Sequence, residues 1–264
     1  MDSEIETSGG WIRLDGAVNV RDLGGLPTDD GRTTRSGRLL RADNLQDLSE
    51  ADVRLLVDDV GVRQVLDLRT SVEIEFEGPG PITREAVVAV RELTLYPEAG
   101  KRTDALTEDV AGASSTGVSN TERTPWTTGR GEPRDIDSGE RPAVIHYLGY
   151  LRHASANIIE ALRAIGDCGD GATLVHCAAG KDRTGTVIAL ALLQAGVRRD
   201  AVVADYARSG EVIDKIMTRL ASTPTYAADV SDADGNPVTD ATMDPVTWAG
   251  IANRQRPRAE TMHR

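Results

Sequence analysis

The chain has 264 residues, of which 39% are hydrophobic but only 3% aromatic, so it can bury a sizeable core built mostly from aliphatic side chains. Acidic residues outnumber basic ones by 42 to 30, and a surface with a formal net charge of -12 repels nucleic acid and anionic lipid. Two cysteines make no disulfide framework, the N-terminus lacks the cationic and apolar regions of a signal peptide, and no apolar run is long enough to cross a membrane. These features predict a cytoplasmic protein that neither binds nucleic acid nor inserts stably into a membrane.

The first part of the chain predicts two strands and one helix. Short strands are expected near Trp11 to Leu14 and over Arg38 to Ala42, with turns rich in glycine and aspartate between them. The next segment predicts a helix, because Ser49 at the N-cap and Asp52 three residues later form a capping-box pattern, and Gly61 suits its C-terminal end.

Two more strands and a long polar insertion follow. Residues 63–69 predict a buried strand because their apolar side chains cluster, and residues 86–93 are a further strand candidate. Residues 97–141 are rich in Ser, Thr and Gly and have no sustained hydrophobic period. We expect this insertion to be either a disordered tether or a lid-like loop.

A helical period begins at Tyr147. One apolar stripe is expected to contain Leu148, Leu151, Ile158, Leu162 and Ile165. Residues 172–177 then predict a short buried strand, and the apolar segment that starts near Thr184 and ends at Gly196 predicts a buried helix.

The last part of the chain predicts two helices and a polar segment. One helix is expected to be capped by Asp200 and to run through Tyr206, and residues 210–220 predict another. Its expected buried side is formed by Val212, Ile216, Met217 and Leu220. Residues 222–264 are again polar. Because strands alternate with helices, we expect a single α/β domain over residues 1–264, with a largely parallel central sheet flanked by helices on both faces.

The loop "VHCAAGKDRTG", from Val175 to Gly185, concentrates reactive side chains between a predicted strand and a predicted helix. A nucleotide-binding loop is one interpretation, but it requires Ser or Thr after Gly-Lys and a glycine further upstream. Here Asp182 follows Gly180-Lys181, and no glycine lies at the upstream position. The nucleotide interpretation therefore fails.

A covalent phosphate site fits the same loop. A tight turn between a strand and a helix N-terminus directs its amide N–H groups, here of Ala178, Ala179, Gly180 and Lys181, toward a bound anion. The same field favours the thiolate form of Cys177. Arg183 would clamp phosphoryl oxygens with its planar fork, and the Thr184 hydroxyl would stabilise the departing thiolate.

The reaction expected from this loop is a two-step hydrolysis of a phosphate monoester through a cysteinyl-phosphate, with neither a metal nor a cofactor. A general acid must protonate the leaving oxygen, and Asp182 or Asp67 could do so. Lys181 would add positive charge for substrates with more than one phosphate. His176 is expected either to hold the loop or to tune the thiolate.

Three segments give this sequence a family resemblance: "NVRDLGGLPTDDGR" from Asn19, "QVLDLRTSVEIE" from Gln64, and the cysteine loop itself. With "ADYARS" from Ala204 as a weaker fourth, they resemble the cysteine-dependent protein tyrosine and dual-specificity phosphatases, and most of all the bacterial tyrosine/serine phosphatases of the mycobacterial protein tyrosine phosphatase B type. The loop signature is His-Cys, five residues, Arg and Ser or Thr.

The resemblance implies a phosphatase fold with Cys177 as nucleophile and Arg183 as phosphate clamp. It also implies that the loop aspartate, Asp182, is the general acid and that Lys181 accompanies activity on phosphotyrosine, phosphoserine/threonine and phosphoinositides. Asp22 and Asp67 would support the site, as framework or as chemistry.

Three functions remain open from the sequence. The first is a phosphatase of phosphotyrosine proteins, with phosphoserine and phosphothreonine as further substrates. The second is a phosphoinositide or inositol-phosphate phosphatase, which Lys181 favours. The third is a pseudophosphatase that binds a phosphorylated partner without turnover. The expected partner is a phosphorylated protein or a small phosphate ester, and the sequence predicts no oligomeric state.

Overall fold

The computed structural model describes residues 10–96, 142–223, 225–226 and 256–259. The predicted insertion over 97–141 and most of the polar segment over 222–264 lie outside these described residues.

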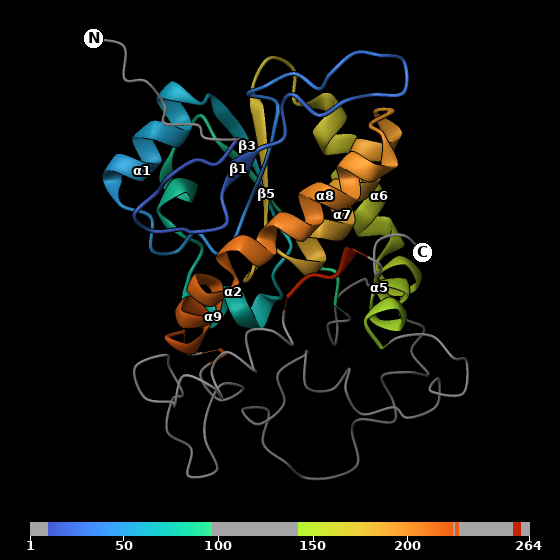
Figure 1. Ribbon diagram of the computed structural model, residues 1–264. Coiled ribbons are helices and arrows are strands. Elements are labelled where there is room, and N and C mark those ends of the chain that lie inside the picture. The colour runs from blue at the N-terminus through green and yellow to red at the C-terminus, as the bar shows by residue number, and fades with distance from the viewer. Residues whose placement is uncertain (1–9, 97–141, 224, 227–255, 260–264) are drawn as a thin grey trace.

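The described residues form a central five-stranded sheet (Figure 1). Its spatial order is β1 (Arg21–Asp22), β2 (Leu39–Ala42), β5 (Ala172–His176), β3 (Val62–Asp67) and β4 (Ala89–Glu92). Strand β1 is antiparallel to β2, and the other neighbouring pairs are parallel. The prediction of a largely parallel sheet is confirmed.

Helices cover both faces of this sheet. They are α1 (Glu50–Arg54), which continues as a π-helix (Leu55–Asp59), α2 (Ser71–Glu77), α5 (Pro142–His153), α6 (Ser155–Asp167), α7 (Asp182–Gln194), α8 (Arg199–Arg208) and α9 (Ile213–Ala221), with 3₁₀ turns at Pro81–Arg84 and Ser209–Val212. One buried cluster joins Leu66 and Val175 of the sheet to α6 and α7, and a second joins Val65 and Leu174 to the α1 side. Neighbouring side chains of β3 and β5 enter opposite clusters because successive residues of a strand point to opposite faces of the sheet, so both faces of these strands are buried.

Several local predictions are confirmed. Ser49 caps α1, with its hydroxyl accepting from the Asp52 N–H while the Asp52 carboxylate accepts from the Ser49 N–H. The predicted strands over 38–42, 63–69, 86–93 and 172–177 correspond to β2, β3, β4 and β5. The apolar side of α9 is also buried, through Ile216, Met217 and Leu220.

The predicted strand near Trp11 to Leu14 was wrong, because Trp11 makes only an isolated bridge to Arg21. The predicted stripe from Leu148 to Ile165 was also wrong in its first half. The helix is interrupted at Ala154, whose φ of -131° and ψ of 26° lie outside the helical range. The interruption shifts the helical phase, so Leu148 and Leu151 are 38% and 41% exposed.

Two helix starts also differ from the prediction. Helix α7 begins at Asp182 rather than near Thr184, and its second half is partly exposed, with Leu193 at 47%. Helix α8 begins before Asp200, which lies in its first turn and accepts hydrogen bonds from the Arg198 guanidinium. Asp200 is therefore not the N-cap.

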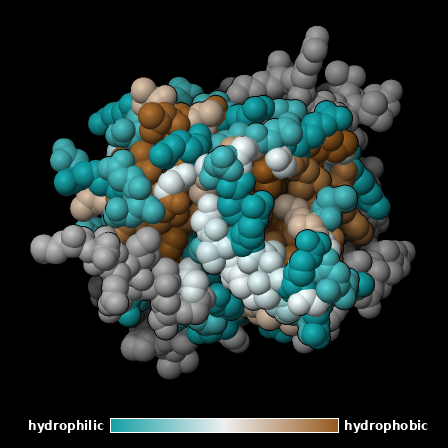
Figure 2. All heavy atoms as spheres, turned by 90° about the horizontal axis from the view of Figure 1, so that it is seen from above, coloured by the Kyte–Doolittle hydropathy of each residue, from teal (hydrophilic) through white to brown (hydrophobic). Residues whose placement is uncertain are grey.

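The face opposite the carboxyl ends of the parallel strands carries hydrophobic patches interrupted by polar side chains (Figure 2). None of the helices in the described part of the chain is long and apolar enough to span a membrane.

Candidate active site

The cysteine loop lies where the parallel strands end, between β5 and α7. Cys177 follows the last residue of β5 and is 2% exposed. Gly180 has a φ of +64°, and a Cβ built on it would lie 2.3 Å from the carbonyl oxygen of Ala42. The turn therefore requires glycine, because an L side chain would be strained in φ and would also clash with β2.

Three consecutive loop carbonyls are hydrogen bonded on the outer side of the turn. Ala178 O accepts from the Asn44 N–H at 3.0 Å, and Ala179 O accepts from Asn19 Nδ2 at 3.0 Å. Gly180 O accepts from Arg41 Nη2 at 2.7 Å. In a planar trans peptide the N–H points away from the C=O, so the next three amides point away from these hydrogen-bond partners. These contacts orient the peptide groups of Ala179, Gly180 and Lys181, three of the four amides in the predicted anion site.

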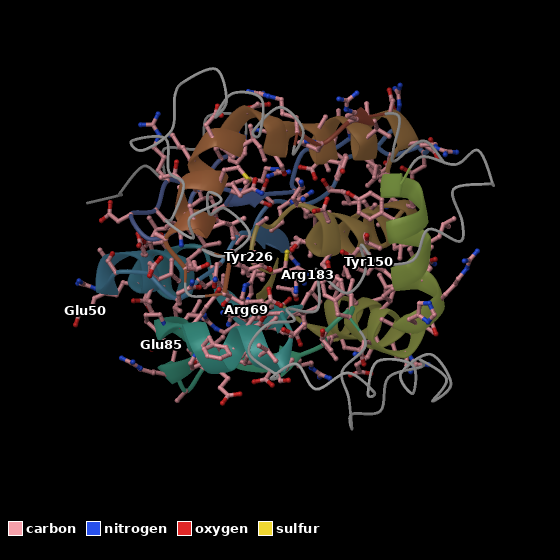
Figure 3. The ribbon with its side chains drawn as sticks, turned by 90° about the horizontal axis from the view of Figure 1, so that it is seen from below. Glu50, Arg69, Glu85, Tyr150, Arg183 and Tyr226 are labelled. Carbon is pink, nitrogen blue, oxygen red and sulfur yellow. The ribbon has the colours of Figure 1, made fainter. Side chains whose placement is uncertain are left out.

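Arg183 is bound to a carboxylate that the sequence analysis did not identify. Its Nη1 and Nη2 each lie 2.7 Å from an oxygen of Glu73, which is fully buried on α2. Nη1 also donates to Leu68 O at 3.1 Å, and Nη2 donates to the Tyr226 hydroxyl at 3.0 Å. Viewed from below, Arg183 lies between Tyr226 and Tyr150 (Figure 3).

Charge pairing controls the ionisation of this pair. Burial alone would raise the pKa of Glu73, but the Arg183 guanidinium outweighs it and holds that pKa below its usual range. Burial would lower the pKa of Arg183, but Glu73 raises it well above its ordinary value. Both groups are therefore charged at neutral pH, and the guanidinium is fixed beside the loop.

Asp182 is at the exposed side of the site, with 35% of its side chain accessible. The Tyr147 hydroxyl donates to Asp182 Oδ1 at 2.5 Å and lies 2.6 Å from the Tyr206 hydroxyl. Lys181 Nζ lies 3.5 Å from Asp182 Oδ2. Burial, and then the charge of Asp182, raise the pKa of Tyr147, so this phenol stays protonated and orients the carboxylate.

His176 and Asp67 form a buried pair behind the loop. His176 Nε2 lies 3.6 Å from Asp67 Oδ2, and Arg69 donates to both oxygens of Asp67. Burial lowers the pKa of His176 to about 4 against the opposing charge of Asp67, so the ring is neutral at neutral pH. Burial would raise the pKa of Asp67, but His176 and Arg69 hold it below its usual value. Asp67 is therefore ionised and only 3% exposed, whereas Asp182 is partly accessible.

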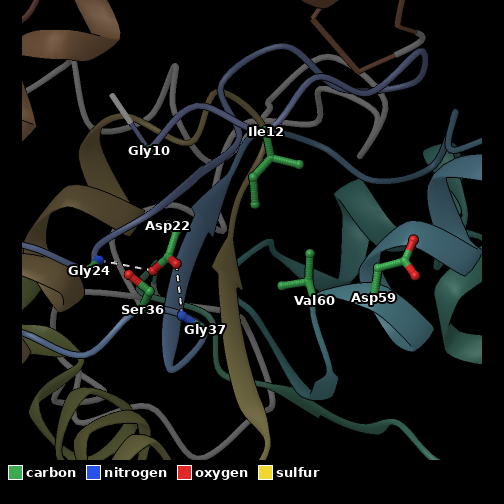
Figure 4. A pocket seen from close by; sticks show the side chains of 8 residues that line it. All are labelled: Gly10, Ile12, Asp22, Gly24, Ser36, Gly37, Asp59 and Val60. Carbon is green, nitrogen blue, oxygen red and sulfur yellow. Dashed lines mark hydrogen bonds between the residues drawn. The ribbon is translucent and has the colours of Figure 1, made fainter. Parts of the chain in front are cut away.

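The two remaining predicted residues have different positions. Thr184 is fully buried at the start of α7, and its hydroxyl has no hydrogen-bond partner among the described residues. Asp22 is not brought to the loop. It pairs with Leu40 in the sheet, and its carboxylate accepts from the N–H groups of Gly24 and Gly37 beside a cavity of about 470 Å³ (Figure 4). It stabilises these turns.

Tyrosines surround the site more densely than the sequence indicated. The chain has five, Tyr96, Tyr147, Tyr150, Tyr206 and Tyr226, and each lies within one or two contacts of Arg183 or Asp182. The Arg183 guanidinium carbon lies 5.0 Å from the centre of the Tyr96 ring. Their concentration around one loop was not readable from their spacing in the chain.

A family model described as "Tyrosine phosphatase family" matches residues 12–263. The chain belongs to the tyrosine phosphatase family. This phosphatase is 31% identical over 221 residues to the "Triple specificity protein phosphatase PtpB" of Mycobacterium tuberculosis, a match that covers 78% of this chain and 72% of the relative. It is 28% identical to a putative tyrosine-protein phosphatase of Cupriavidus necator, over 76% of this chain and 63% of the relative. A tyrosine-protein phosphatase of Nostoc commune is 38% identical over 68 residues, which is 26% of this chain and 23% of the relative. The activity of this phosphatase is the hydrolysis of phosphate monoesters.

Proposed function

We propose that this phosphatase hydrolyses phosphotyrosine in proteins through a cysteinyl-phosphate on Cys177. The observation that carries the proposal is the arrangement of the loop: a cysteine at a strand end, a turn whose carbonyls are hydrogen bonded to neighbouring segments, a helix N-terminus and a fixed guanidinium. In the first step Cys177 Sγ attacks phosphorus and the bond to the tyrosine oxygen breaks. In the second step water attacks phosphorus, the S–P bond breaks, and inorganic phosphate and the thiolate are released.

Asp182 is the proposed proton donor and acceptor. It would protonate the leaving phenolate in the first step and accept a proton from water in the second. Its partial exposure and its hydrogen bond from Tyr147 support this role, since the carboxyl is both accessible and oriented. The Thr184 hydroxyl would donate to the thiolate as the S–P bond breaks.

The experiment compares Cys177→Ser with Cys168→Ser, which removes the other cysteine of the chain. Hydrolysis of p-nitrophenyl phosphate and of a phosphotyrosine peptide is measured in the presence of a chelator. Cys177→Ser should lose activity by several orders of magnitude, and acid-quenched wild type should carry a phosphoryl group on Cys177 by mass spectrometry. Full activity in Cys177→Ser would overturn the proposal, and so would binding of the phosphopeptide without turnover by the wild type.

The position of Lys181 motivates a broader substrate range. Its ammonium lies in the loop, 3.5 Å from the Asp182 carboxylate, and adds positive charge beside the proposed phosphate site. The name of the Mycobacterium tuberculosis relative also states three specificities for that protein. Lys181→Met should reduce kcat/KM more for a soluble inositol phosphate than for a phosphotyrosine peptide. Equal losses on the two substrates would leave phosphotyrosine as the substrate class.

A further inference from the structure

Behind the cysteine loop lies a fully buried polar cluster that the proposed reaction does not use. It consists of Asn19, Arg21, Arg41, Asp205 and Ser209, and each is at most 3% exposed. Their side chains come from the segment before β1, from β1, from β2, from α8 and from the turn after α8. Buried charges are costly unless they are paired, so a cluster of this kind requires an explanation.

The charges in this cluster do not balance within it. Asp205 Oδ1 accepts from Arg21 Nε at 2.7 Å, and Asp205 Oδ2 accepts from Arg41 Nη1 at 2.6 Å. Two guanidinium groups therefore share one carboxylate. Arg41 is the guanidinium of this pair that contacts the loop, because its Nη2 donates to Gly180 O at 2.7 Å.

Asn19 adds a second contact to the loop. Its Nδ2 donates to Ala179 O at 3.0 Å and to Gly180 O at 3.2 Å. Its Oδ1 accepts from Arg21 Nη1 at 2.7 Å, which fixes the amide so that the NH₂ end faces the loop. Two Asp43 contacts, to the N–H groups of Val18 and Asn19, hold the backbone of this segment.

These contacts act on the peptide groups that would bind a phosphate. The carbonyl of Ala179 and the N–H of Gly180 belong to one peptide group, as do the carbonyl of Gly180 and the N–H of Lys181. A cation bonded to such a carbonyl orients the peptide and strengthens the dipole of its N–H. The N–H of Gly180 has no hydrogen-bond acceptor among the residues that the structure describes.

We propose that Arg41 and Asn19 are positioning residues that aim and polarise the Gly180 and Lys181 amides of the loop toward a tetrahedral oxyanion. Arg21 and Asp205 hold these two side chains in place. This inference rests on the proposed function, because it assigns a role to residues outside the loop in the same phosphate site.

The test is the inhibition constant of tungstate, an inert tetrahedral oxyanion, together with the melting temperature. Arg41→Met retains the length of the side chain and leaves Asp205 paired with Arg21. It should weaken tungstate about tenfold, less than the 100- to 1,000-fold loss of an entire oxyanion donor, because the amides remain but are no longer held. The kcat for p-nitrophenyl phosphate should fall with it.

Arg38→Met is the matched control, since Arg38 also donates to a carbonyl, that of Gly169, but precedes β2 at the opposite end of the sheet. It should leave the tungstate constant unchanged. Arg41→Lys should recover part of the loss, because an ammonium reaches Gly180 O or Asp205 but cannot bridge both. Asn19→Ser provides a second, independent variant if Arg41→Met does not fold.

A lower melting temperature in Arg41→Met and Asn19→Ser, with wild-type tungstate inhibition, would overturn this inference, because it would reveal a structural role alone. Failure of the wild type itself to bind tungstate would instead overturn the proposed function. The two failures are therefore distinguishable in one experiment.

Discussion

Glu73→Gln tests whether the guanidinium beside the loop depends on a single buried carboxylate. Glu73 accepts four hydrogen bonds, from the Thr70 N–H at 2.7 Å, from two nitrogens of Arg183 and from the Tyr226 hydroxyl at 2.5 Å. A glutamine keeps the shape of the side chain, but its NH₂ group must face at least one of these donors. It also leaves the charge of Arg183 buried without a counter-charge.

Removing one partner of a buried ion pair costs about 3–5 kcal/mol. For a chain of this size, the loss corresponds to a fall in melting temperature on the order of 10 °C. Urea denaturation and calorimetry should show it at neutral pH. Glu75→Gln is the control, because Glu75 is exposed on the same helix, α2, and should change stability by no more than about 0.5 kcal/mol.

The stability lost in Glu73→Gln should depend on pH. Because the pKa of folded Glu73 lies below its ordinary 4.5, its ionisation stabilises the fold above that pH and the contribution is lost as pH falls further. The difference between wild type and Glu73→Gln should therefore be largest at neutral pH and shrink in acid. If Glu73→Gln lost no more stability than Glu75→Gln, the reasoning about this ion pair would be refuted.

Three further predictions concern the loop and its supports. Tyr147→Phe removes the hydrogen bond that orients the proposed general acid, Asp182. It should lower kcat about tenfold for alkyl phosphates, whose leaving oxygen needs a proton, but little for p-nitrophenyl phosphate. Equal losses of kcat for the two leaving groups would contradict this. Gly180→Ala should abolish tungstate inhibition and turnover, because the added Cβ meets the Ala42 carbonyl at 2.3 Å, and calorimetry would show whether the fold survives. His176→Gln should flatten the fall in stability that wild type shows from pH 6.5 down to about 4. In this range the unfolded chain protonates His176, whereas the buried ring of the folded protein, with its pKa lowered to about 4, stays neutral. An unchanged dependence of the unfolding free energy on pH, measured by urea denaturation, would refute this.

The parts of the site that could be predicted are those that depend on neighbouring residues. A strand, a turn with glycine and a helix N-terminus are local, and the loop from Cys177 to Thr184 could be located from them. Helix α2 was not predicted, although its capping box, with Thr70 as N-cap and Glu73 three residues later, is also a local pattern. What no local pattern indicates is that Glu73 binds a guanidinium 110 residues further along the chain.

Other errors have the same origin. The stripe predicted from Leu148 onward assumed one continuous helix, and the interruption at Ala154 turned Tyr150 inward instead. Arg41 and Asn19 stand in segments without a distinctive period, and their roles depend on the pairing of β2 with β5, which brings Ala42 beside His176. Such contacts depend on which strands pair over long sequence distances, and local patterns in a single sequence do not indicate that pairing.

The guanidinium of Arg183 has five N–H groups, and four of them already have acceptors in Glu73, Leu68 and Tyr226. Two parallel bonds to a phosphoryl group require Nε and one Nη, so an arriving dianion in the proposed reaction must replace an existing oxygen partner. The phenol of Tyr226 is the uncharged side chain among them. When phosphate binds, a phosphoryl oxygen would then replace an existing oxygen acceptor of Arg183, and when phosphate leaves, that acceptor would bind again. The buried guanidinium therefore keeps its hydrogen bonds after the product has left.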